Sequence, residues 1–250
     1  MSSREDKLPL LQHLRELRKV VVFSVIAIAV GFIVVFLAFS EQLLTFFSRP
    51  LLERDVEIIN IGLAEPFVAQ MRASFVAGFV LASPLVFGKF WSFLKPALFP
   101  RERALFRLVF VIVMLLFISG VLFAYIYVFN ITVNFFLLMG QNVAVPQITI
   151  DMYIRMLFNF VIPFGLAFQL PVVVFLLYRL GMVTLEALTK KRKYIVFAVF
   201  VVATLITPPD VWSQIMLALP LLLLYEISII VIRIASRKKP IESEDDDNDS

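Results

Sequence analysis

The sequence has no cysteine and only one histidine, His13, among its 250 residues. A chain without cysteine forms no disulfide and offers no thiolate ligand or thiol nucleophile, and a single histidine is too little for an ordinary zinc site. Charged residues are also scarce, at 17% against about 25% in soluble domains. These absences argue against a disulfide scaffold, a thiol enzyme and a metalloenzyme, so any chemistry must use carboxylates, arginines and amides.

Apolar residues take the place of the missing polar ones. They make up 61% of the chain, which includes 27 phenylalanines, whereas soluble domains contain about 45 to 50%. A helix needs about 20 apolar residues to cross a hydrocarbon core of ~30 Å. The composition therefore indicates an integral membrane protein of the all-α class.

Six apolar stretches meet or approach this length, at about residues 20–40, 73–94, 108–130, 156–178, 194–207 and 211–232. The fifth is short, so the last pair could instead form a re-entrant hairpin. That hairpin would place Asp210 near the middle of the membrane, at a cost of ~2.5 to 3.5 kcal/mol. We therefore favour six spans, of which the last two are short enough to thin the bilayer around them.

Prolines and charges complete the expected architecture. Four prolines fall within the predicted spans, where each kinks its helix; they are Pro84, Pro163, Pro171 and Pro220. Residues 1–241 are expected to form one kinked six-helix domain. Residues 242–250 carry six acidic side chains, which is typical of a disordered, solvated tail.

Lysines and arginines are distributed so as to predict the orientation of the chain. Clusters of basic residues precede the first span and lie in the second and fourth loops, whereas the third loop is poor in them and the fifth has none. Cytoplasmic loops carry the excess of such residues. The pattern predicts a multi-pass protein of the cytoplasmic (inner) membrane with both termini in the cytoplasm.

Two isolated acids, Glu16 and Glu102, lie in the basic cytoplasmic segments. Glu16 is on the charged face of an amphipathic stretch that runs into the first span, and it could simply pair with Lys19, three residues away. Glu102 precedes the third span, where an acid suits a helix N-terminus. If folding brings the two together, however, they form a pair of carboxylates that could bind two adjacent guanidinium groups bidentately.

Polar residues within or beside the spans have structural and functional interpretations. Gln169 lies in the middle of the fourth span and could hydrogen-bond to another helix of this chain or hold a partner helix. Glu226 could pair with a basic flank such as Arg233, although an acid inside a membrane is a functional candidate by default. Asp210 and Asp151 are expected to be the N-caps of the sixth and fourth spans.

Several separated motifs are similar to those of one known family. The chain resembles TatC, the multispanning subunit of the twin-arginine protein translocase, over about residues 8–233. The resemblance rests on His13-Leu14-Arg15-Glu16-Leu17-Arg18, Lys95-Pro96-Ala97-Leu98 with Glu102, Phe123-Ala124-Tyr125, Phe164-Gly165, Phe168-Gln169-Leu170-Pro171, Lys191-Arg192-Lys193-Tyr194 and residues 204–214, TLITPPDVWSQ.

The resemblance implies a glove-like concave bundle without enzymatic activity, cofactor, bound metal or nucleic-acid partner. It assigns the binding of Arg-Arg signal peptides of folded cargo to Glu16 and Glu102, with Arg18 lining the site. It also implies that Gln169 and Thr207 contact single-span subunits of the TatA and TatB type, and that the protein self-associates in a larger complex within membrane lipid. Transport would be driven by the protonmotive force.

The sequence departs from the family pattern at two places. Gln169 stands where many relatives have glutamate, which favours a neutral hydrogen-bonding role at this position. Phe129-Asn130 replaces a common Phe-Pro at the end of the third span.

Two competing interpretations remain. A secondary transporter of a small solute or ion predicts repeated halves and a charged site at the bilayer midplane, and neither is evident. A purely structural scaffold is the third interpretation. No GxxxxGK[ST] loop is present, so the sequence gives no sign of nucleotide-driven transport.

Overall fold

Helices make up nearly all of the structure. The computed structural model describes residues 7–54, 56, 58–98, 103–140, 147–206 and 211–237. Within them the elements are α1 (Lys7–Leu52), β1 (Ile58–Ile59), α2 (Glu65–Leu98), α3 (Arg103–Phe123), the π-helix η1 (Ala124–Phe129), α4 (Asn130–Gly140), β2 (Ile148–Thr149), α5 (Ile150–Ala167), α6 (Leu170–Arg179), α7 (Leu185–Lys190), α8 (Arg192–Ile206) and α9 (Val211–Arg237).

Five helical stretches are long and apolar enough to cross a membrane: Arg15–Leu52, Glu65–Phe93, Arg107–Gly140, Ile150–Arg179 and Val211–Ile234. The sixth, α8, has 15 residues, which is roughly 22 Å at 1.5 Å per residue. It is therefore shorter than a ~30 Å hydrocarbon core. These findings confirm the predicted all-α polytopic class, and the first two and last helices extend beyond the apolar stretches that predict them.

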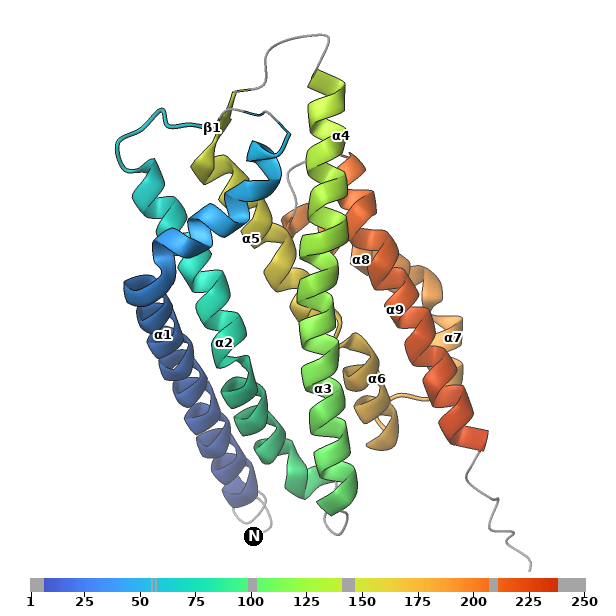
Figure 1. Cartoon of the computed structure of the whole chain (residues 1–250). Coiled ribbons are helices and arrows are strands. Elements are labelled where there is room, and N and C mark those ends of the chain that lie inside the picture. Colours follow the sequence, from blue (N-terminus) through green and yellow to red (C-terminus); the bar gives the residue numbers. More distant parts are fainter. Residues whose placement is uncertain are drawn as a thin grey trace, which may run out of the picture.

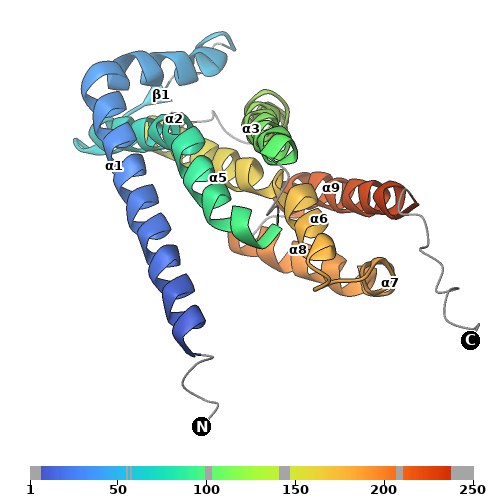
Figure 2. The same ribbon diagram turned by 90° about the horizontal axis from the view of Figure 1, so that it is seen from below.

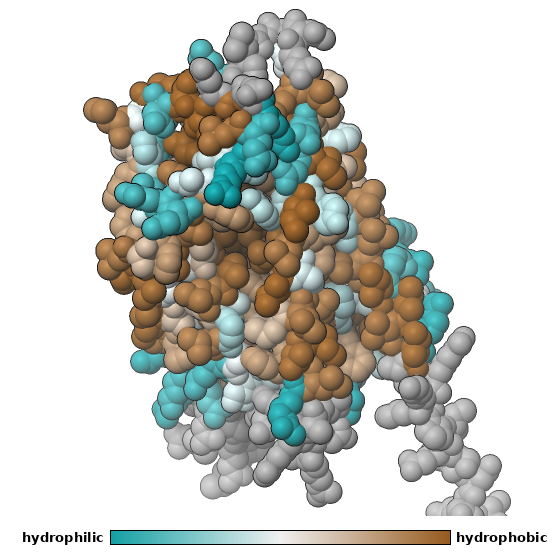
Figure 3. Space-filling model, viewed as in Figure 1, coloured by the Kyte–Doolittle hydropathy of each residue, from teal (hydrophilic) through white to brown (hydrophobic). Residues whose placement is uncertain are grey.

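The helices form a curved layer around α5. Figure 2, seen end-on, shows α1 on one side and α7 and α8 on the other, with α2 and α5 between them. The helices α3, η1 and α4 form one continuous rod on the side of the bundle that faces the viewer in Figure 1, and α9 runs beside this rod. Apolar side chains cover most of the middle of the molecule in Figure 3, while hydrophilic ones gather mainly toward its two ends, as expected for a chain surrounded by lipid.

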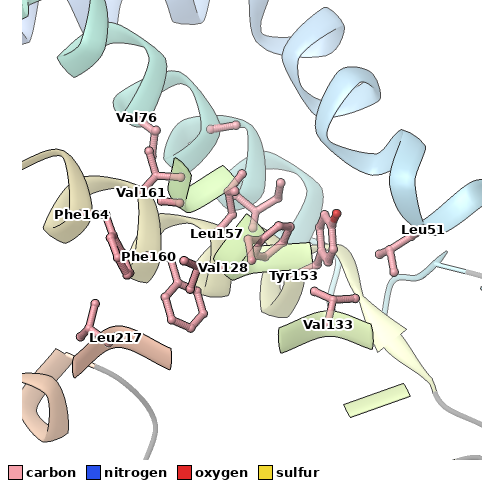
Figure 4. Close-up of a cluster of buried hydrophobic side chains, with 14 of the residues drawn as sticks. Leu51, Val76, Val128, Val133, Tyr153, Leu157, Phe160, Val161, Phe164 and Leu217 are labelled. Atoms are coloured by element: carbon pink, nitrogen blue, oxygen red, sulfur yellow. The ribbon is translucent and has the colours of Figure 1, made fainter. Parts of the chain in front are cut away.

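The main core is built on α5. Leu157, Phe160 and Phe164 are almost completely buried and meet Val76 of α2, Val128 of η1 and Leu217 of α9 (Figure 4). The inward face of α5 therefore holds elements from both halves of the chain. Because lipid tails are as apolar as these side chains, close packing rather than the hydrophobic effect must hold such helices together.

Glycines allow the helices to approach closely at two crossings. A Cβ added to Gly31 of α1 would lie 2.6 Å from the carbonyl oxygen of Gly78 on α2. A Cβ added to Gly120 of α3 would lie 2.8 Å from the carbonyl oxygen of Phe164 on α5, beside Gly165. Small residues at such crossings bring two backbones into contact, as is typical of membrane helices.

Three local features differ from a simple bundle of straight spans. The helix α1 has 46 residues and bends in its second half, so that its last turns cross one end of the bundle (Figures 1 and 2). The six-residue π-helix η1 interrupts the third span. A short parallel pairing joins Ile58 to Ile148 and thereby ties the segment before α2 to the segment before α5.

The fourth span is broken between α5 and α6. Phe168 and Gln169 connect the two helices, and Pro171 lies in the first turn of α6. Proline has no amide hydrogen to continue the hydrogen bonds of α5. The break therefore follows from Pro171, one of the prolines expected to kink the spans, whereas Pro163 lies inside α5 without breaking it.

The cap of α5 corrects one expectation. The N-cap is Thr149, whose Oγ1 accepts a hydrogen bond from the amide of Met152 at 3.2 Å. Asp151 is instead in the first turn of the helix, where its carboxylate accepts hydrogen bonds from Arg72 of α2 and Arg155 of α5. Because the carboxylate of Asp151 is bonded to two arginines, the cap is instead supplied by Thr149, two residues earlier.

Candidate functional site

Glu16 lines a hollow of about 320 Å³ between the start of α1 and the end of α2. Lys19 and Val20 of α1 and Lys89, Ser92 and Phe93 of α2 complete its lining. The side chains of Glu16 and Lys89 are exposed to the surroundings. A peptide at the surface can therefore reach the carboxylate without any change in the packing of the bundle.

Charge balance limits what this hollow can bind alone. Its lining contains one carboxylate and two ammonium groups, those of Lys19 and Lys89. Lys89 lies 5.7 Å from the centre of the Phe23 ring, which holds it against α1. A cationic ligand would be attracted by one charged side chain of the lining and repelled by two.

The second predicted carboxylate, Glu102, lies outside the described residues. The adjoining helices are described: α2 ends at Leu98 and α3 begins at Arg103. Figure 1 places these two helix ends at the same end of the bundle as the first turns of α1. Arg18, the third predicted residue of the site, is exposed on α1, and the lining of the hollow does not include it.

Gln169 is held inside the chain. The residue is 8% exposed, and its Nε2 donates a hydrogen bond to the carbonyl oxygen of Val113 on α3 at 3.2 Å. The side chain thus bridges the broken fourth span to the third. The structure realises the internal hydrogen bond that was one of the two expected roles, and the partner-binding role stays a prediction.

A polar contact joins α8 and α9, of which only α8 is short as expected, since α9 has 27 residues. Gln214 of α9 donates from Nε2 to the carbonyl oxygen of Phe200 at 3.2 Å and to Oγ1 of Thr204 at 2.5 Å, both on α8. Sequence reasoning used Gln214 only as part of a motif and missed this contact. Thr207 and Asp210, predicted as a partner site and an N-cap, lie outside the described residues.

Glu226 forms an ion pair across helices. Its Oε2 lies 2.9 Å from Nη2 of Arg192, at the start of α8, and both side chains are nearly half exposed. The basic partner is thus Arg192, not Arg233 on the same helix. The ion pair gives Glu226 a structural role, because it joins α9 to the first residue of α8.

A second ion-pair network was not foreseen from the sequence. Asp151 bridges Arg72 and Arg155, and only 13% of its side chain is exposed. The signal was present, since an acid precedes an arginine by four residues. The contact with Arg72, 79 residues earlier, could not be read from spacing. The described residues contain no group of three or more histidines, aspartates or glutamates arranged to hold a metal ion.

Comparisons with known proteins identify the family. The family model for the Sec-independent protein translocase protein (TatC) matches residues 12–220. The Sec-independent protein translocase protein TatC of Carboxydothermus hydrogenoformans is 39% identical over 237 residues, which are 94% of this chain and 97% of that protein. The TatC of Aquifex aeolicus is also 39% identical and covers 93% of this chain and 98% of its own length.

Solved structures agree with the sequence relatives. A crystal structure described as the twin arginine translocase receptor TatC superposes with a TM-score of 0.83 at 38% identity, covering 90% of this chain and 100% of the other. A second structure of the receptor, in the detergent DDM, gives a TM-score of 0.81. The chain therefore belongs to the TatC family and is a multi-pass membrane component of a Sec-independent protein translocase, not an enzyme.

Proposed function

We propose that this protein is the receptor subunit that binds Arg-Arg signal peptides of folded cargo at the basic end of the bundle. The observation that carries the proposal is the exposed carboxylate of Glu16 in the hollow between α1 and α2, in a chain of this family. Glu102 is assigned the second carboxylate and Arg18 a place beside the peptide. Each carboxylate would accept a bidentate hydrogen-bonded pair from one guanidinium group.

The arrangement of charge supports a clamp of two acids rather than one. The two lysines in the hollow oppose a cationic ligand, so one carboxylate would give little net attraction in water. A second carboxylate from the segment between α2 and α3 would match the two positive charges of the peptide. Lysine could not replace arginine in the ligand, because its ammonium is a point charge without the planar fork.

The remaining roles follow the same assignment. We assign Gln169 and Thr207 to the docking of single-span TatA/TatB-type subunits. The basic end of the bundle would face the cytoplasm, with both termini on that side of the inner membrane. The protein would work in a complex with further copies of itself and use the protonmotive force.

Direct binding measurements test the first step. We expect Glu16→Gln and Glu102→Gln each to weaken binding of a fluorescent Arg-Arg signal peptide to the purified full-length chain about tenfold, or ~1.4 kcal/mol. The matched control is Glu186→Gln, since Glu186 is exposed on α7 and pairs with Lys190 away from the hollow. A Lys-Lys peptide should bind more weakly than the Arg-Arg peptide.

The clamp would be rejected if both glutamine variants bound the peptide as tightly as the unmodified chain while remaining monodisperse in detergent. Equal weakening by Glu186→Gln would reject it as well, because the effect would then reflect the general surface charge at this end.

A further inference from the structure

A second hollow lies away from Glu16, among the helices of the second half of the chain. It is a groove of about 910 Å³ lined by side chains of α5, α6, α7, α8 and α9. Its volume is at the upper end of the ~300 to 1,000 Å³ that small-molecule sites occupy. Leu166 and Val202 line it and are 48% and 46% exposed, so the groove is open to whatever surrounds the protein.

The long walls of the groove are apolar. Ile162 and Leu170 come from the broken fourth span, Val199 from α8 and Leu221 from α9. In a membrane such a surface is covered by acyl chains or by another apolar helix. Because both would fit the walls equally well, the walls alone do not select the occupant.

Charge at one end of the groove selects between them. The segment 190–193 contains four consecutive basic residues, and three of them are engaged. Lys190 pairs with Glu186 at 2.6 Å and Arg192 with Glu226 at 2.9 Å, while Lys193 lies over the Tyr194 ring at 5.2 Å.

Lys191 is the remaining member of the segment, and it lines the groove. Within the described part of the chain its ammonium group makes no ion pair. Thr184, the N-cap of α7, also lines the groove. Its Oγ1 accepts a hydrogen bond from the amide of Ala187 at 3.1 Å, which leaves the hydroxyl hydrogen free to donate. The lining of the groove thus contains one cation and no carboxylate.

Tyr225 closes the groove at the same end. Its hydroxyl donates to the carbonyl oxygen of Leu188 at 2.8 Å, and the residue is 5% exposed. The hydrogen bond joins α7 to α9, and Lys191 follows directly after the last turn of α7. A cation beside an apolar groove matches a ligand with an anionic head and a long apolar tail.

We propose that this groove is a binding site for an anionic glycerophospholipid. An acyl chain lies between α5, α8 and α9, and the headgroup phosphate is held by Nζ of Lys191. With the proposed orientation, the anionic cytoplasmic leaflet supplies the ligand, since basic residues at a membrane surface attract anionic lipids. The site is separate from the Glu16 hollow and shares no residue with it.

The absence of cysteine makes a direct test simple. Ala198 lines the groove and is exposed on α8, so Ala198→Cys in the full chain gives a single site for a fluorescent label. Phosphatidylglycerol with brominated acyl chains quenches the label when it enters the groove. Brominated phosphatidylcholine is the matched neutral lipid, and Leu37→Cys, at a residue 78% exposed on α1, is the matched label position outside the groove.

We expect half-maximal quenching at Ala198→Cys to need at least fivefold less phosphatidylglycerol than phosphatidylcholine, with no such preference at Leu37→Cys. Adding Lys191→Gln should remove the preference, and Lys191→Arg should restore it. Lys193→Gln makes the same change in net charge outside the groove and should leave the preference intact.

Three results would overturn the proposal. One is equal quenching by the two lipids at Ala198→Cys. Another is an equal loss of preference in Lys191→Gln and Lys193→Gln, because the effect would then be one of general surface charge. The third is quenching that does not depend on the headgroup but is relieved by an Arg-Arg signal peptide, since the groove would then belong to that peptide.

Discussion

At the scale of single residues, Gln169 illustrates how a polar group can be retained within a membrane bundle. Its amide reaches across to a backbone carbonyl of α3, beside the break that Pro171 imposes on the fourth span. Interhelical hydrogen bonds in membranes contribute on average about 0.6 kcal/mol and rarely more than about 1.7. The residue therefore contributes modestly to stability and chiefly fixes how α5 and α6 lie against α3.

We expect Gln169→Leu to lower the free energy of unfolding by about 1 kcal/mol, measured by thermal unfolding of the purified protein in detergent. Ser119→Ala is the control, because Ser119 is exposed on α3 and bonds only within its own helix. If Gln169→Leu lowered the free energy of unfolding no more than the control does, the hydrogen bond to Val113 would contribute nothing measurable to stability.

Asp151 joins two helices through arginines that differ in exposure. The side chain of Arg72 is 30% exposed and that of Arg155 is 60% exposed, so solvent screens the second pair more strongly. We expect destabilisation in the order Asp151→Asn, then Arg72→Gln, then Arg155→Gln. Asp151→Asn should cost about 1.5 to 3 kcal/mol, and Arg155→Gln about 0.5 kcal/mol or less.

Chemical unfolding of these three variants measures the order. The reverse order, with Arg155→Gln the most damaging, would mean that the bond within α5 matters more than the bond from α5 to α2.

At the scale of elements, the glycine crossings determine how closely the helices can pack. At Gly78 an added Cβ would lie 2.6 Å from the backbone nitrogen of Phe32 on α1, and a backbone atom cannot move aside as a flexible side chain can. We expect Gly78→Val to destabilise the protein by about 1 to 3 kcal/mol, as overpacking does, with a corresponding loss of folded protein from membranes.

Gly140→Ala is the control for this crossing, because nothing lies within 4 Å of a Cβ at Gly140. Fluorescence-detected size-exclusion chromatography after heating compares the two variants. Equal thermal stability of Gly78→Val and Gly140→Ala would contradict the close approach of α1 and α2.

The elements also show how far sequence reasoning extends. The apolar stretches predict six spans because a span is a local property of about 20 residues, and Pro171 predicts the break in the fourth. The bend of α1, the π-helix η1 and the pairing of Ile58 with Ile148 were not predicted. The pairing joins segments far apart in the chain, which spacing does not encode.

Sequence reasoning likewise identified some residues of the candidate site but not the partners that they contact. Glu16 and Gln169 were selected because a charge or an amide is unusual in its setting, and the structure describes both. Glu226 was expected to pair with a basic flank such as Arg233, which is near in sequence, whereas the structure pairs it with Arg192, which is near in space. Asp151 was predicted to be a cap because its bond to Arg72, on another helix, cannot be inferred from sequence spacing.

At the scale of the whole molecule, the two ends of the bundle are distinguished by their charges. The first turns of α1 lie at one end of the bundle, and the segment between β1 and α2 lies at the other (Figure 1). That segment contains Leu63, which is fully exposed, whereas Lys190 belongs to a basic loop that is predicted to be cytoplasmic. Single cysteines in this cysteine-free chain report the orientation. We expect a membrane-impermeant thiol reagent to label Leu63→Cys in intact cells and Lys190→Cys only after the membrane is opened.

The reverse labelling would place the basic end outside and contradict the proposed orientation. Lys190 is a suitable position because its side chain is 75% exposed. Labelling of both variants in intact cells would mean that the reagent crosses the membrane, which a cysteine variant of a cytosolic protein detects.

The filling of the bundle by α5 has a consequence for how anything passes the membrane. In the described part of the chain, side chains of α5 occupy the centre, and the hollows of about 320 and 910 Å³ are lined by separate sets of helices on either side of it. A folded domain of 100 residues has a radius of gyration of about 13 Å. In the described part of the chain one copy offers no opening of that size, so under the proposed function a conduit for folded cargo would be assembled from several chains.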